Sequence, residues 1–106
     1  MCGIFGIITS AESNYSPDFL NKSLRKLATL SERRGKDSSG LCLYNQLHNK
    51  IDIIKGPVEI SKLLKNANVS KLINEAFQNS DKAKYAFGHA RLVTNGTQLN
   101  DDNNQP

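Results

Sequence analysis

The second residue of the chain, Cys2, is the first candidate for chemistry, because it follows the initiator methionine and precedes a glycine. Removal of Met1 would leave Cys2 with a free α-amino group, whose usual pKa of about 7.7–8.0 suits a base at neutral pH. A thiol and an amine on one residue can then act together as nucleophile and base in acyl transfer. The alternative interpretation is that Cys2 is a small buried hydrophobic residue.

Two further blocks of sequence follow Cys2. The first is Arg34-Gly35-Lys36-Asp37-Ser38-Ser39-Gly40, and the second is Gly88-His89-Ala90-Arg91-Leu92-Val93-Thr94-Asn95-Gly96. Together with Met1-Cys2-Gly3-Ile4-Phe5-Gly6-Ile7, they resemble the class II glutamine amidotransferases, which include glutamine–fructose-6-phosphate aminotransferase, amidophosphoribosyltransferase, asparagine synthetase and glutamate synthase. The resemblance spans the whole chain and implies a glutaminase that releases ammonia from glutamine through a thioester on Cys2.

The second and third blocks contain the expected substrate site. A guanidinium can hold the α-carboxylate of glutamine with two parallel hydrogen bonds, which suits Arg91; the alternative for Arg91 is a surface salt bridge. The resemblance adds Leu92, Thr94 and Asn95 to the substrate-binding residues. Leu92 stands where the aminotransferases have an aromatic residue, and Asn95 where they often have histidine. The resemblance also implies an active-site loop beside Cys2, formed by Arg34, Gly35 and Asp37.

The spacing of the substrate-binding residues sets a condition on the backbone. Arg91 and Thr94 would point to opposite faces of a regular strand. Both can contact one ligand only if the strand ends near Arg91 and the backbone then curls, for which Asn95-Gly96 supplies a turn.

The remaining thiol and imidazole groups have simpler interpretations. Cys42 stands in an apolar segment and is predicted to be a buried structural thiol. We expect His89 to pack within a strand, because the Cys2 amine already supplies a base, and His48 to be a surface residue. Two cysteines and two histidines at unrelated spacings predict no metal site, and no cofactor is expected.

Periodicity places these residues on strands and helices. Gly3–Thr9 is a short apolar run that predicts a buried strand. Ser16-Pro17-Asp18 predicts the start of a helix that should end near Arg33-Arg34-Gly35. Its apolar face is formed by Leu20, Leu24, Leu27 and Ala28. Strands are further predicted at residues 41–45, 51–55 and 85–94, and helices at residues 59–64 and 70–79.

Composition limits the class of protein. The 106 residues, 38% hydrophobic and 23% charged, suit one globular domain. The net charge of +4 comes from scattered lysines, so no nucleic-acid partner is expected. No apolar run approaches the ~20 residues that cross a bilayer. No signal peptide is recognisable, so the expected location is cytoplasmic, without membrane contact.

The resemblance implies an α+β chain with the N-terminal-nucleophile hydrolase fold. In this four-layer αββα arrangement, residues 1–106 would form only the first, apparently truncated part of a type-2 glutamine amidotransferase domain. The chain ends in what looks like a loop, and an acceptor domain or subunit is expected downstream. Because an Asn-Gly pair and an Asp expected at the oxyanion site would lie beyond Pro106, the 106 residues alone are expected to be inactive.

The acceptor of the ammonia is the least determined part of the expected function. The second block and the Thr94-to-Gly96 segment favour an aminotransferase that transfers ammonia to a sugar phosphate, as in glutamine–fructose-6-phosphate aminotransferase. Alternatives are an amidotransferase of the amidophosphoribosyltransferase, asparagine synthetase or glutamate synthase type, or a truncated, non-catalytic glutaminase-like fragment.

Overall fold

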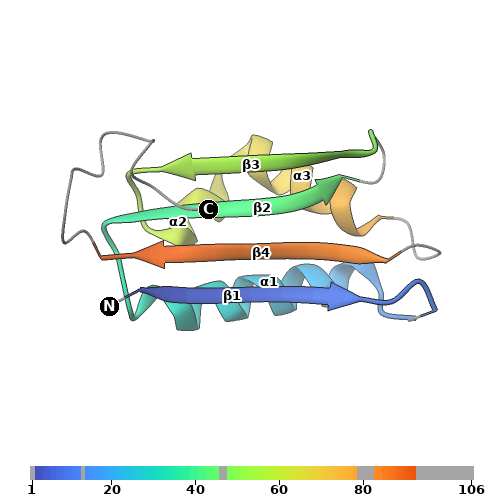
Figure 1. The fold of residues 1–106 in the computed structure, drawn as a ribbon, viewed down its shortest axis with the longest axis horizontal. Helices are drawn as coiled ribbons and strands as arrows, with labels where there is room; N and C mark the ends of the chain where they lie inside the picture. The colour runs from blue at the N-terminus through green and yellow to red at the C-terminus, as the bar shows by residue number, and fades with distance from the viewer. Residues whose placement is uncertain (1, 13, 46–47, 79–82, 93–106) are drawn as a thin grey trace.

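The computed structural model describes residues 2–12, 14–45, 48–78 and 83–92, and within them one antiparallel sheet has three helices on one face (Figure 1). In chain order the elements are β1 (Gly3–Thr9), α1 (Pro17–Glu32), β2 (Ser38–Asn45), β3 (Lys50–Gly56), α2 (Ile60–Lys65), α3 (Ala67–Phe77) and β4 (Lys84–Arg91). This arrangement confirms the α+β class.

The order of the strands in the sheet is β1-β4-β2-β3. β4, the last strand of the described residues, therefore lies between β1 and β2 and pairs with both, antiparallel in each case. As a result, Gly3 of β1 and Ser39 of β2 are both paired with Ala90 of β4. Segments at the start, the middle and the end of the described chain meet at one end of the sheet.

The hydrophobic core fills the space between the helices and the sheet. Its fully buried side chains are Leu24, Ala28, Leu41, Leu43, Ile60, Ile73, Ala76, Phe77, Ala86 and Ala90. The helices are also joined by a polar cross-link, because Arg25 of α1 donates to the carbonyl oxygen of Leu64 at 2.9 Å and to Ser70 Oγ at 3.2 Å. The core thus fixes α1 against β1 and β4, and α2 and α3 against β2.

The first helix follows its sequence signals closely. Ser16 is the N-cap and accepts a hydrogen bond from the backbone N–H of Phe19, and Pro17 occupies the first helical position. Leu20, Leu24 and Ala28 are buried as expected, and Leu27 is partly buried. The helix ends at Glu32, one residue before the predicted end near Arg33-Arg34-Gly35.

The other elements agree with the expected types and differ in their limits. β2 begins at Ser38, three residues before the predicted start, because Ser38 and Ser39 already pair with β4. α3 begins at Ala67, earlier than predicted, because the side chain of Asn66 caps it by accepting from the N–H groups of Asn68 and Val69. Such shifts arise from tertiary pairing and capping that periodicity does not register.

The prediction of a buried β1 is wrong for one of its faces. Phe5 is buried, whereas Ile4 and Ile8 are 80% and 77% exposed. β1 is an edge strand of the described sheet, and the helices cover only the side to which Gly3, Phe5 and Thr9 point. A continuous apolar run cannot by itself tell whether both faces of a strand are covered.

The face of the sheet that carries no helix is apolar. Neighbouring strands place their large hydrophobic side chains there, and these are exposed: Ile4 and Ile8 of β1, Tyr85 and Phe87 of β4, and Ile51 and Ile53 of β3. A second sheet on this face, as the four-layer arrangement requires, is not found within the described residues.

Candidate functional site

The described residues of the three sequence blocks converge at one end of the sheet. Cys2 directly precedes β1, whose first residue pairs with Ala90, the neighbour of Arg91. The α1–β2 loop, residues 33–37, leads into Ser38, which pairs with Arg91 from the other side. In Figure 1 the start of β1, the start of β2 and the arrowhead of β4 all lie at the left end of the sheet.

A cleft opens between the start of β1 and the end of α1. It has a volume of about 510 Å³, and its lining includes Cys2, Ile4, Leu27, Leu30, Ser31 and Arg34. Cys2 is exposed and its thiol is free. The cleft therefore brings together a solvent-accessible thiol, a guanidinium and an apolar wall, a combination that suits a small polar substrate with an aliphatic part.

Close contact between β1 and α1 requires the glycine beside Cys2. A Cβ atom at Gly3 would come within 2.6 Å of the carbonyl oxygen of Ser31 and would also collide with its hydroxyl. The hydroxyl could rotate away, but the carbonyl oxygen belongs to the backbone of α1 and could not. Gly3 therefore allows the start of β1, and with it Cys2, to lie directly against the end of α1.

The α1–β2 loop is fixed on both of its sides. The N–H of Arg34 donates to the carbonyl oxygen of Ser31 at 3.0 Å, and the N–H of Gly35 donates to that of Glu32 at 3.1 Å. On the sheet side, the N–H of Asp37 donates to the carbonyl oxygen of Arg91 at 3.0 Å. These bonds join the expected active-site loop to the expected carboxylate-binding arginine.

Gly35 packs directly on the backbone at the end of β4. A Cβ atom at this position would collide with the carbonyl carbon of Arg91 and lie 2.5 Å from the nitrogen of Leu92. Because these are backbone atoms, a larger residue would displace the loop or the strand end. Packing against the backbone of β4 therefore requires glycine at position 35, which the sequence alone did not reveal.

The end of β4 meets the first part of the condition set by the spacing of the substrate-binding residues, and the predicted turn at Asn95-Gly96 lies outside the described residues. The strand ends at Arg91, which is half-buried, and Leu92 follows it with 43% of its surface exposed. Thr94 and Asn95 lie outside the described residues. Of the expected substrate-binding residues, the structure therefore places Arg91 and Leu92 beside the loop and gives no position for the other two.

His89 is buried in β4, with its neighbours Gly40 and Ile4 paired on either side. Burial, and then the positive charge of Arg91, lower the pKa of the imidazole below its ordinary value of 6.5. Within the described part of the chain, its Nδ1 atom is buried and has no hydrogen-bond partner. The His89 side chain is therefore neutral and buried between neighbouring strands, in agreement with a strand-packing role.

The buried imidazole predicts a loss of stability in acid. Because its pKa is lower in the folded state, the unfolded chain binds more protons as the pH falls below about 6.5. The free energy of unfolding should then decrease between pH 7.5 and pH 5.5. We expect this decrease to be smaller in His89→Gln, measured by denaturant unfolding, and unchanged in His48→Gln, since His48 is exposed. Equal pH dependence in both variants would contradict the assignment.

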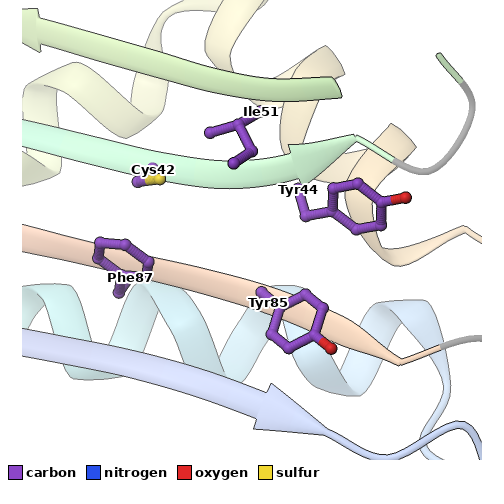
Figure 2. A pocket seen from close by; sticks show the side chains of 5 residues that line it. All are labelled: Cys42, Tyr44, Ile51, Tyr85 and Phe87. Atoms are coloured by element: carbon purple, nitrogen blue, oxygen red, sulfur yellow. The ribbon is translucent and has the colours of Figure 1, made fainter. Parts of the chain in front are cut away.

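Cys42 differs from Cys2 in its burial. It lies on the helix-free face of β2, is only 9% exposed, and burial raises the pKa of its thiol. It borders a hollow of about 290 Å³ with Tyr44, Ile51, Tyr85 and Phe87, all of which are apolar or aromatic (Figure 2). The expected structural role of Cys42 agrees with this position, since burial disfavours the thiolate and a thiol is a poor nucleophile.

Two kinds of site are absent from the described residues. No group of three or more histidine, cysteine, aspartate or glutamate side chains in this part of the chain could hold a metal ion. Among the helices at residues 17–32, 60–65 and 67–77, none is both long and apolar enough to cross a bilayer.

Comparison with known proteins gives one distant relationship. The chain is 29% identical over 96 residues to a protein of Sulfolobus acidocaldarius named glutamine–fructose-6-phosphate aminotransferase (isomerizing). The match covers 91% of this chain and 14% of the relative, so the chain spans about one-seventh of that protein's length. No family model matches the sequence, and no solved structure matches it. The similarity relates the chain distantly to the glutamine amidotransferases.

Proposed function

We propose that this chain supplies the glutaminase half of a glutamine amidotransferase, with Cys2 as the nucleophile. The observation that carries the proposal is the convergence of Cys2, the α1–β2 loop and Arg91 at one end of the sheet. These segments are far apart in the sequence, and the hydrophobic core alone would not require their polar residues to meet. The distant similarity to an aminotransferase that is named for its use of glutamine supports the same activity.

The proposed reaction is acyl transfer from the side-chain amide of glutamine. After removal of Met1, the α-amino group of Cys2 accepts the thiol proton, and the thiolate attacks the amide carbon. The amine returns the proton to the leaving nitrogen, so the C–N bond breaks and ammonia departs. Water then attacks the γ-glutamyl thioester, which releases glutamate and restores the thiol. No metal or cofactor enters these steps.

The remaining expected residues take substrate-binding and positioning roles in the proposal. Arg91 holds the α-carboxylate of glutamine, with Leu92, Thr94 and Asn95 completing the contacts. Arg34 and the backbone of Gly35 orient the Cys2 amine, and Asp37 braces the loop. The position of Arg34 in the lining of the cleft that contains Cys2 supports this division of roles.

We further propose the four-layer N-terminal-nucleophile fold for the complete domain. One face of the sheet is already covered by helices, and the other exposes large apolar side chains such as Ile4, Ile8 and Phe87. Monomeric proteins rarely leave an apolar patch of this extent in water, so a second sheet is a suitable cover. The acceptor of the ammonia, for which a sugar phosphate is the first candidate, would bind in a downstream domain or subunit.

Residues 1–106 alone are proposed to be inactive. The mechanism needs hydrogen-bond donors for the developing oxyanion, and the proposal assigns no residue of this chain to that role. Loss of such a donor costs about 10²–10³ in rate. A non-catalytic, glutaminase-like fragment is therefore the competing proposal for this chain in isolation.

A single labelling experiment tests the proposed nucleophile in the complete protein. A glutamine analogue with a chloroketone in place of the amide should add one equivalent of label, which peptide mass spectrometry should locate on Cys2. The labelled peptide should begin at Cys2, because the amine must be free. Excess glutamine should slow the labelling. Label on Cys42, or fully active protein that retains Met1, would contradict the mechanism.

A further inference from the structure

Glu32, the last residue of α1, is bonded through both its side chain and its backbone. Its Oε1 atom accepts hydrogen bonds from the N–H of Ser61 at 3.0 Å and from the Ser61 hydroxyl at 2.6 Å. Its carbonyl oxygen accepts the N–H of Gly35 at 3.1 Å. Ser61 belongs to the first turn of α2, so one residue connects that helix to the α1–β2 loop.

We infer that Glu32 is a positioning residue of the glutaminase site, holding the α1–β2 loop in place through its bonds to Ser61. The inference rests on the proposed function, for which this loop lies beside the nucleophile. Glu32 itself does not border the cleft and is given no contact with the substrate.

The first step of the argument is that the bonds to Ser61 are strong. The carboxylate is half-buried, and burial raises its pKa. The two hydrogen bonds from Ser61 and the positive charges of Lys36 and Lys65 lower the pKa by more than burial raises it. The pKa of Glu32 therefore lies below its ordinary value of 4.5. Glu32 is therefore ionised at neutral pH. Hydrogen bonds to an ionised acceptor are shorter and roughly twice as strong as neutral ones.

The second step is that the position of Glu32 determines the position of the loop. The carbonyl oxygen that holds Gly35 belongs to the same residue as the anchored carboxylate, so Gly35 cannot shift without disturbing one of the bonds. Gly35 in turn packs on the backbone of Arg91, and the neighbouring Asp37 donates to the Arg91 carbonyl. A displacement at the end of α1 would therefore pass to Arg34 in the cleft and to Arg91.

The third step is the size of the effect. Misplacement of reacting groups by about 1 Å can cost about 10²-fold in rate, even when the mutated residue is remote from the chemistry. Removal of the Glu32 carboxylate should thus lower kcat more than it raises KM, since Cys2 and its amine would lose alignment with Arg34. A residue that served only general stability would lower the melting temperature and leave the kinetics of the folded enzyme unchanged.

Three variants of the complete protein test the inference. Glu32→Ala removes both bonds to Ser61, whereas Glu32→Gln keeps an oxygen that can still accept them but carries no charge. Glu59→Gln is the matched control, because Glu59 lies beside the same end of α2 and its carboxylate pairs only loosely with Lys62, at 4.0 Å. Glutamate release is measured at a temperature where circular dichroism shows every variant to be folded.

We expect kcat to fall by about 10- to 100-fold in Glu32→Ala, by a smaller factor in Glu32→Gln, and not in Glu59→Gln. Amide hydrogen exchange is the second readout and needs no catalysis. Exchange at Gly35 should accelerate by about tenfold in Glu32→Ala and remain unchanged in the control. If Glu32→Ala does not fold, kcat and the exchange rate of the Gly35 amide are compared between Glu32→Gln and Glu59→Gln instead.

The outcomes separate the inference from the function on which it rests. Wild-type protein that releases no glutamate would refute the proposed function, and the exchange rate of Gly35 would still show whether Glu32 holds the loop. Wild-type activity together with unchanged kcat and unchanged Gly35 exchange in the Glu32 variants would refute the positioning role and leave the proposed function intact.

Discussion

Replacement of Cys2 by alanine is expected to lower the rate of glutamate release from glutamine by about 10⁴-fold or more, because the thioester cannot form. The same change at Cys42 should leave the rate within about twofold, with some loss of stability from the small cavity. The pair is a matched comparison, since both side chains are free thiols and one is exposed while the other is buried.

The measurement is glutamate release by the complete protein, with each variant checked by circular dichroism. Cys2→Ala should be folded and inactive. Cys2→Ser is a useful third variant, because it keeps a nucleophile with a much less acidic proton and should retain at most a small residual rate. An active Cys2→Ala protein would remove Cys2 from the mechanism, and an inactive but folded Cys42→Ala protein would show that the wrong thiol had been chosen.

Arg91→Lys is expected to raise the KM for glutamine by about 10- to 100-fold with a smaller change in kcat. Lysine keeps the positive charge but has no planar pair of donors for a carboxylate, so one of two charge-assisted hydrogen bonds is lost. The change should act on ground-state and transition-state binding alike, since the α-carboxylate does not react. Steady-state kinetics with glutamine gives both constants.

Arg33→Lys is the control for this variant, because Arg33 is an exposed arginine only two residues before Gly35. Its KM should stay within about twofold of wild type. If Arg91→Lys instead lowered the melting temperature and left KM unchanged, Arg91 would be reassigned to the packing between the loop and β4. Equal effects of the two changes would show that the loss of the guanidinium at Arg91 is not specific to glutamine binding.

Local sequence signals predicted most of the elements. The start of α1 is specified by residues next to one another, with Ser16 as cap and Pro17 in the first turn, and the structure has both in those roles. The sequence predicted the first and last residues of β2 and β4 less accurately. Ser38 and Ser39 have weak strand propensity and belong to β2 because β4 pairs with them.

Burial was the quantity that the sequence predicted least well. Ile4 and Phe5 are adjacent and similarly hydrophobic, yet one is 80% exposed and the other is 7% exposed. The difference depends on which side of β1 the helices cover, which no periodicity within β1 can specify. Lys84 shows the opposite case, since it is almost completely buried at the start of β4 although lysine usually remains in water.

The sequence by itself determined the chemistry that is available: a thiol and an amine at Cys2, a guanidinium at Arg91, and a loop with a glycine at residue 35. These are properties of single residues and their immediate neighbours. The tertiary structure decided that the three lie together, because β4 inserts between β1 and β2 and pairs Gly3 and Ser39 with the same residue. Strand order follows from long-range pairing and core packing, and for that reason the backbone contact between Gly35 and Arg91 was visible only in the folded chain.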